Sequence, residues 1–96
     1  MSVTKEQIEP IFEEFKRKLT SKFPEVYDVE LYNGIVKKGF TSHDIDIRMK
    51  IRGYKKLPEI IETIASLSVT FPLDLDVGVV LYLTNFTICV RSVFQR

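Results

Sequence analysis

The clearest pattern in the chain is a strict alternation of charged and apolar residues between positions 44 and 52. The segment reads Asp-Ile-Asp-Ile-Arg-Met-Lys-Ile-Arg, so a charged side chain stands on either side of each apolar one. A period of two sustained over this length is typical of a β-strand with one buried and one solvated face. The side chains predicted to face a core are Ile45, Ile47, Met49 and Ile51.

A helical periodicity occupies the start of the chain. Thr4 and Gln7 have the spacing of a capping box, in which the two side chains cap the first backbone N–H groups of a helix. The residues that follow predict an amphipathic helix over about residues 4–22. Pro10 either kinks this helix or marks its first turn, and Pro24 ends it. The apolar stripe consists of Ile8, Ile11, Phe12, Phe15, Leu19 and Phe23.

A strand and a connection lie between this helix and the alternating segment. Residues 26–33 are rich in Val, Tyr and Leu and predict a strand that ends at Gly34. Residues 34–42 predict a glycine-bounded connection with room for one helical turn.

The last third of the chain predicts a helix and two strands. Pro58 suits the first position of a helix, and Phe71-Pro72 ends that helix. Residues 73–83 become wholly apolar toward their end, which predicts a central strand covered on both faces. After a tight turn, residues 86–94 predict a final strand antiparallel to it.

The predicted order is helix, strand, strand, helix, strand, strand. This order predicts an α+β domain in which two main helices cover one face of a mixed sheet. The 96 residues, 45% of them hydrophobic, are enough for a single domain over residues 1–96. The formal net charge of +1 gives no overall attraction to nucleic acid or to a membrane surface.

Cysteine content and the start of the chain predict the compartment. Cys89 is the only cysteine, which excludes an internal disulfide and a cysteine zinc cluster, and it is expected to pack in the core. The N-terminus carries a helix-start signal in place of a signal peptide, so a cytoplasmic location is expected. The apolar run at 77–83 is too short to span a bilayer, and no membrane association is predicted.

Two Asp-x-Asp pairs are the candidate chemistry. Alternation places Asp44 and Asp46 on one face of a strand, about 7 Å apart, and Asp74 and Asp76 repeat this arrangement. If the two strands are neighbours, the carboxylates converge and repel one another, and a hard cation such as Mg²⁺ or Mn²⁺ relieves that repulsion. The alternative is an ordinary wet strand face with surface ion pairs. Aspartate is depleted in strands, so the second pair favours the metal site.

Basic groups and glycines lie close to the first acidic pair. Gly34 and Gly39 bound a loop in which the backbone can approach phosphate groups closely. His43 is positioned to touch a phosphate or a metal, although a lone histidine beside a strand is more often solvated. Carboxylates next to cations suit a metal-bound polyphosphate. The basic residues are Lys37, Lys38, Arg48, Lys50 and Arg52.

The stretches Leu-Tyr-Asn-Gly at 31–34 and Ser-His-Asp-Ile-Asp-Ile at 42–47 resemble a known signature. It is that of the DNA polymerase β-like nucleotidyltransferase superfamily, and in particular of its small stand-alone members, the minimal nucleotidyltransferases. In that family a strand ends in a Gly-Gly or Gly-Ser pair, a short helical spacer follows, and the next strand carries Asp-x-Asp. A third carboxylate follows on the strand after the next helix, and Phe-Pro-Leu-Asp-Leu-Asp at 71–76 is similar to that element.

The resemblance implies transfer of a nucleoside monophosphate from an NTP to a protein or nucleic-acid acceptor, with Mg²⁺ or Mn²⁺ as cofactor. Asp44 and Asp46 take the role of metal ligands, and the third carboxylate is Asp74 or Asp76, with a slight preference for Asp74. A partner protein is also implied, because stand-alone members often work in two-component pairs. The residues expected to contact the nucleotide are Gly34, Lys37, Lys38, Ser42 and Arg48.

The chain departs from the family pattern at the glycine pair. Here the pair reads Gly34-Ile35, and a branched side chain in the second position is expected to hinder the approach of phosphate. Asn33-Gly34 is the alternative counterpart.

Two other functions are compatible with the same residues. One is a module of this fold that has lost nucleotide transfer and serves in binding or assembly, for example as a homodimer through its final strand. The other is a metal-dependent nuclease, in which acidic residues and a lysine share a strand. Arg48 stands where the nuclease pattern needs the lysine, and a guanidinium cannot deprotonate, so the nuclease ranks below the transferase.

Overall fold

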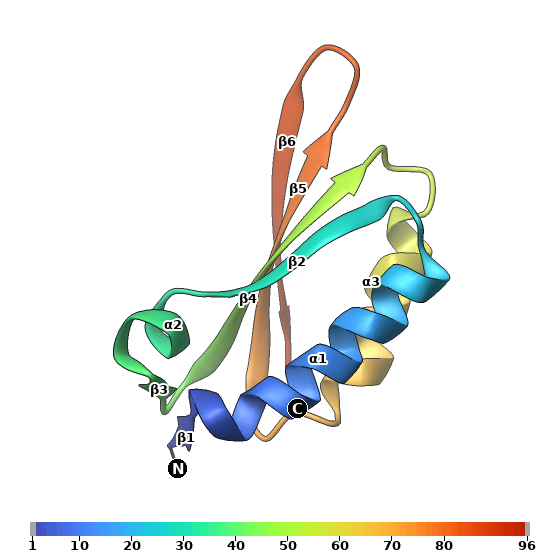
Figure 1. Cartoon of the computed structure of the whole chain (residues 1–96). Helices are drawn as coiled ribbons and strands as arrows, with labels where there is room; N and C mark the ends of the chain where they lie inside the picture. The colour runs from blue at the N-terminus through green and yellow to red at the C-terminus, as the bar shows by residue number, and fades with distance from the viewer. Residues whose placement is uncertain (1, 96) are drawn as a thin grey trace.

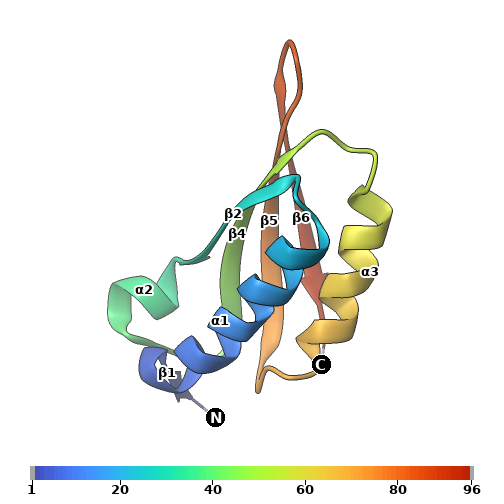
Figure 2. The same cartoon turned by 45° about the vertical axis from the view of Figure 1, so that its right-hand side comes forward.

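The computed structural model describes residues 2–95 as an α+β fold built around a four-stranded mixed sheet. The strand order is β2-β4-β5-β6, with β4 and β5 parallel and the two outer pairs antiparallel. Helices α1 and α3 lie together on one face of this sheet (Figures 1 and 2). The strands are β2 (Val26–Tyr32), β4 (Asp44–Arg52), β5 (Asp74–Tyr82) and β6 (Thr87–Phe94), and the two long helices are α1 (Lys5–Lys22) and α3 (Leu57–Ser68). The predicted α+β class with a mixed sheet is confirmed.

Helix α1 begins at the predicted capping box. The Thr4 side chain accepts a hydrogen bond from the Gln7 N–H at 3.2 Å, and the Gln7 side chain accepts one from the Thr4 N–H at 2.9 Å. Pro10 lies inside the helix, five residues after its start, so it does not mark the first turn. Its ring nitrogen has no hydrogen to donate to the carbonyl of Glu6.

The hydrophobic core lies between the two long helices and the sheet. All four apolar residues of the alternating strand β4 are buried, as predicted. Phe15 of α1 packs edge-on against Phe71, with ring centroids 5.4 Å apart, and closes the core near the end of α3. Burial of these side chains is the main source of stability in a domain of this size.

The connection between β2 and β4 contains a short helix, α2 (Gly34–Lys38). It ends at Gly39, whose φ of +79° is a conformation that favours glycine. A two-stranded ribbon of β1 (Val3–Thr4) and β3 (Phe40–Thr41) then ties this connection to the start of α1. The predicted glycine-bounded connection with one helical turn is confirmed.

Two predictions about burial are wrong. Strand β5 is central, but only one of its faces is covered throughout: on the opposite face Asp76 is buried, while Gly78, Val80 and Tyr82 remain partly or fully exposed. Cys89 is exposed and does not pack in the core, because it lies beside Val80 on that same face. The physical reason is that both long helices cover the same side, so the other face of the sheet stays open (Figure 2).

Within residues 2–95, no helix is both long and apolar enough to cross a bilayer.

Candidate functional site

The two acidic pairs lie side by side on the open face of the sheet. In the parallel ladder between β4 and β5, Asp44 is opposite Asp74 and Asp46 is opposite Asp76. The condition set for the two acidic pairs, that their strands are neighbours, is therefore met. All four aspartates therefore lie on one face of the sheet. Within each strand the two aspartates are two residues apart, and each is directly opposite an aspartate of the other strand.

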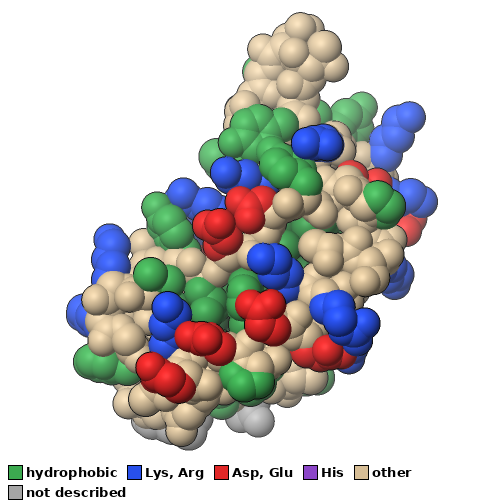
Figure 3. Space-filling model, in the orientation of Figure 1, with side chains coloured by type: hydrophobic (Ala, Val, Ile, Leu, Met, Phe, Trp, Pro, Cys, Tyr) green, Lys and Arg blue, Asp and Glu red, His purple; other side chains and the backbone are tan. Residues whose placement is uncertain are grey.

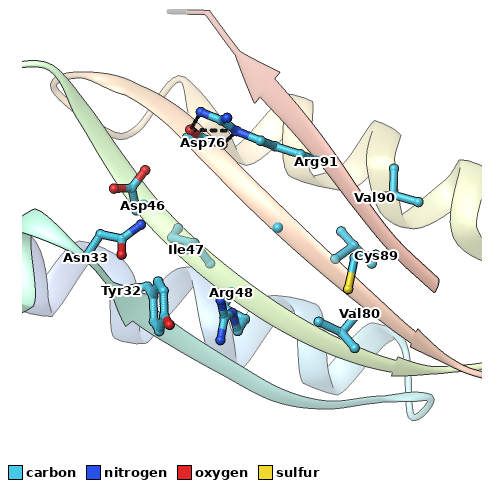
Figure 4. A pocket seen from close by; sticks show the side chains of 12 residues that line it. Tyr32, Asn33, Asp46, Ile47, Arg48, Asp76, Val80, Cys89, Val90 and Arg91 are labelled. Atoms are coloured by element: carbon cyan, nitrogen blue, oxygen red, sulfur yellow. Dashed lines mark hydrogen bonds and ion pairs between the residues drawn. The ribbon is translucent and has the colours of Figure 1, made fainter. Parts of the chain in front are cut away.

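Asp76 is held by an arginine from the last strand. The side chain of Asp76 is only 9% exposed, whereas that of Arg91 is 74% exposed. The Nε of Arg91 donates to both carboxylate oxygens, at 2.8 and 3.0 Å, and Nη2 donates to Oδ2 as well (Figure 4). This pairing raises the pKa of Arg91, first through the hydrogen bond and then through the charge of Asp76. A guanidinium fork of this kind is the geometry that best compensates a buried carboxylate.

Asp46 is less well compensated. Burial is the largest cause of its raised pKa, and the negative charges of Asp76 and Asp44 add to it. The Asn33 side chain acts in the opposite direction by hydrogen bonding to the carboxylate, and Arg91 also lowers the pKa through its charge. The net rise in pKa means that burial and the two neighbouring carboxylates together outweigh the hydrogen bond from Asn33 and the charge of Arg91.

A pocket of about 420 Å³ opens at the N-terminal end of β4. It brings Asp44 and Asp46 together with three of the residues predicted to contact phosphate, Gly34, Lys38 and Ser42. Lys37 is exposed on α2 and does not line this pocket, nor does Asp74. Asp76 does line it, together with His43 and Arg91, so its position suits the third carboxylate better than that of Asp74.

Arg48 lies on the other side of the acidic group. Its guanidinium stacks over the Tyr32 ring at 3.8 Å from the ring centroid. It lines a second pocket, of about 400 Å³, that shares Asp46, Asp76 and Arg91 with the first (Figure 4). The carboxylates therefore stand between two hollows, one bearing Lys38 and the other bearing Arg48.

The glycine pair has a geometry that the sequence did not reveal. Ile35 is 1% exposed and faces the core, so its branched side chain does not hinder phosphate at the surface. Asn33 has a φ of +55°, an unusual conformation for a residue other than glycine. It directs its side chain toward Asp46 (Figure 4).

The donor chemistry of the site suits a hard divalent cation, although its side chains do not surround a common point. Among the described residues 2–95, no three Asp, Glu, His or Cys side chains are grouped closely enough to hold an ion. Carboxylate oxygens are nonetheless the ligands that Mg²⁺ and Mn²⁺ prefer, and a bound cation would offset the repulsion that Asp46 experiences from Asp76 and Asp44.

The contacts that Arg91 and Asn33 make with the aspartates were not predicted from the sequence. Arg91 is the only charged residue of β6, and strand alternation from Asp76 through the hairpin places it on the acidic face. This single charge in an otherwise uncharged strand was the feature of the sequence that could have identified Arg91 as a site residue. Asn33 was considered only as part of the alternative pair Asn33-Gly34, and its contact with Asp46 had no signal in the sequence because it depends on a positive φ and on the β2–β4 register.

Comparisons of the chain with known proteins identify no relative. No protein-family model, curated protein or solved structure matches the chain.

Proposed function

We propose that this protein is a metal-dependent nucleotidyltransferase, which moves a nucleoside monophosphate from an NTP such as ATP to an acceptor and releases pyrophosphate. The observation that carries the proposal is the in-register placement of Asp44 and Asp46 beside Asp74 and Asp76 on an open sheet face. The adjoining pocket supplies Lys38 and Ser42 for the phosphates of the donor.

The succession of elements supports the same proposal. Strand β2 ends just before Gly34, the short helix α2 follows, β4 carries Asp-x-Asp, and β5 carries the next acidic pair after α3. This is the order of features in the minimal nucleotidyltransferases that the sequence resembles. The core-facing Ile35 leaves room at the surface for phosphate where the family has a small residue.

The roles of the chain's own residues follow from their positions. Asp44 and Asp46 would hold Mg²⁺ or Mn²⁺, which when bound supplies positive charge for the transferred phosphate and the leaving pyrophosphate. Lys38 and Ser42 bind the remaining phosphate oxygens from the rim of the pocket. Asp76 would accept the proton of an acceptor hydroxyl after the ion pair with Arg91 opens. The Arg91 side chain is 74% exposed, so it can rotate away from Asp76 into solvent.

Calorimetric titration with Mg·ATP tests the proposal. We expect the wild-type protein to bind, and Asp44→Asn to weaken binding by at least tenfold, because it removes one negative charge from the cation site. Glu30→Gln is the matched control, since Glu30 is exposed on the neighbouring strand β2 and lines neither pocket. Absence of binding at millimolar Mg·ATP would overturn the proposal.

A second function is favoured by one observation, the ion pair between Arg91 and Asp76. A carboxylate that is permanently held by arginine has no part in catalysis, and the fold then serves as a binding or assembly module for another protein or a second copy. Wild type and Asp44→Asn would both fail to bind Mg·ATP in that case, and neither would release pyrophosphate from ATP.

A further inference from the structure

Gly78 lies in the middle of the central strand β5, where neither its backbone conformation nor its described neighbours require a glycine. It lies in β5, paired with β4 on one side and β6 on the other. Its φ lies outside the left-handed region, and a Cβ built on it meets no atom within 4 Å. Neither backbone conformation nor crowding by neighbours within residues 2–95 therefore requires glycine at this position.

A glycine inside a strand destabilises it, because the residue loses more backbone entropy on folding and packs no side chain. Such a glycine often marks a place where a ligand approaches the backbone closely. Since no neighbouring side chain of the described chain fills the space above Gly78, the space itself is the feature that the glycine preserves.

The surroundings of Gly78 define a small site. It forms the floor of the 400 Å³ pocket, with Val80 and Cys89 as apolar neighbours. In register, Arg48 lies to one side and Arg91 to the other, so their backbones are about 10 Å apart, twice the spacing of strands. That width accommodates a flat ring lying on the exposed peptide of the strand.

The polar groups at the rim favour a ring over an anion. Both arginines are already engaged, Arg91 with Asp76 and Arg48 with the Tyr32 ring. Asp46 contributes a carboxylate and Asn33 an amide at the same edge (Figure 4). A hydrogen-bond acceptor next to a stacked Arg–Tyr wall matches a nucleobase that carries an amino group, because the carboxylate accepts from that group.

We propose that the hollow over Gly78 is a nucleobase site, which takes the ring of adenine, cytosine or guanine between Arg48 and Arg91. The inference deepens the proposed function, on which its link to catalysis rests. The base belongs either to the donor NTP or to an acceptor nucleotide, and both place a nucleoside next to Asp46 and Asp76.

Amide chemical shifts of the ¹⁵N-labelled protein, titrated with adenosine in the absence of divalent cations, test this site. We expect saturable shifts at Gly78 and at its neighbours Val79 and Cys89, and weaker binding of uridine, which has no amino group. Gly78→Val should weaken adenosine binding by at least tenfold, because it fills the hollow. Thr87→Val is the matched control, since Thr87 is on the open face of β6 but does not line the pocket.

Folding of the variants is checked by circular dichroism. The Gly78→Val protein should melt at or above the wild-type temperature, since valine is favoured in strands and meets no neighbour here. Cys89→Phe fills the same hollow from β6 and should also abolish adenosine binding. Wild-type affinity in both filled variants, shifts that map elsewhere, or no saturable shift would overturn the nucleobase site.

Two further titrations separate the sources of the base and the two proposals. Adenosine displaced by Mg·ATP identifies the donor base, while simultaneous binding of both identifies an acceptor base, and either result supports the site. Magnesium tripolyphosphate tests the acidic pocket without any base. If it fails to bind while adenosine still shifts Gly78, the transferase proposal fails and the nucleobase site stands.

Discussion

Asp46 shows how a single residue at the site opposes folding. Its carboxylate lies on the open face of β4 but is half-buried next to Asp76 and Asp44, and these surroundings raise its pKa. A carboxyl group with a raised pKa in the folded state binds its proton more tightly there than in the unfolded chain. The protein therefore loses stability as pH rises from the ordinary aspartate pKa through the raised one, and the loss persists above it.

Asp46→Asn is expected to raise the melting temperature at pH 7, since the amide carries no charge to be buried. The gain should shrink as the pH is lowered below the ordinary pKa of aspartate, where the wild-type carboxyl is itself neutral. Thermal melts of both proteins across this pH range measure the effect. Glu30→Gln, at an exposed position of the same face, should leave the melting temperature nearly unchanged. A lower melting temperature for Asp46→Asn at pH 7 would contradict this account.

At the scale of elements, the N-terminal capping box decides where α1 begins. Thr4 and Gln7 satisfy each other's backbone N–H groups, and Thr4 also belongs to the ribbon β1 that pairs with β3. The cap therefore joins the first helix to the connection that carries Lys38 and Ser42. Pro10 lies one turn further on and weakens the helix, which makes the cap more important to its first turns.

Thr4→Ala should lower the free energy of unfolding by about 1 kcal/mol, the usual effect of losing an N-cap side chain. Thr4→Ser is the matched control, because serine keeps the hydroxyl that accepts from the Gln7 N–H. Urea denaturation of the three proteins measures the difference. Equal stability of the alanine and serine variants would show that the cap contributes nothing.

Alternation predicted the burial of β4 correctly and that of β5 only in part. The period of two in β4 predicted both the strand and its buried face correctly, because one face meets helices and the other meets solvent. In β5 the continuous apolar run suggested two buried faces, yet Val80 and Tyr82 lie on the open one. These apolar side chains have other neighbours on the open face: Val80 lines the 400 Å³ pocket, and the Tyr82 ring lies 6.1 Å from the Tyr27 ring, centroid to centroid.

At the scale of the whole molecule, the β5–β6 hairpin extends beyond the helices (Figure 1). The chain carries no charged residue from Leu83 to Val90, and the projecting end of the molecule shows no charged side chain in Figure 3. Exposed apolar groups of the hairpin include Phe86 and Val93. Within residues 2–95, β6 forms one edge of the sheet, so its outer N–H and C=O groups are available to another strand.

We therefore expect concentration-dependent association of the protein through β6, and Ile88→Lys should reduce it by placing a charge on the edge strand. Ser66→Lys is the control, since it adds the same charge on an exposed turn of α3. Sedimentation velocity over a range of concentrations measures the association. A wild-type protein that stays monomeric at the highest concentration, or equal association of both variants, would contradict the expectation.

The sequence by itself determined the main helices and strands of this protein and which side chains share a face of each. Alternation, helical spacing and the capping box are local properties, so they predicted β4, α1 and the common face of Asp44 and Asp46 without knowledge of the rest of the chain.

Only the tertiary structure decided what meets across the sheet. Strand order and register brought Asp46 beside Asp76 and placed Arg91 against that carboxylate, and the one-sided packing of α1 and α3 left Gly78 and Cys89 open to solvent. These contacts join residues far apart in the chain. They depend on which faces are covered, and no local pattern of hydrophobic and polar residues contains that information.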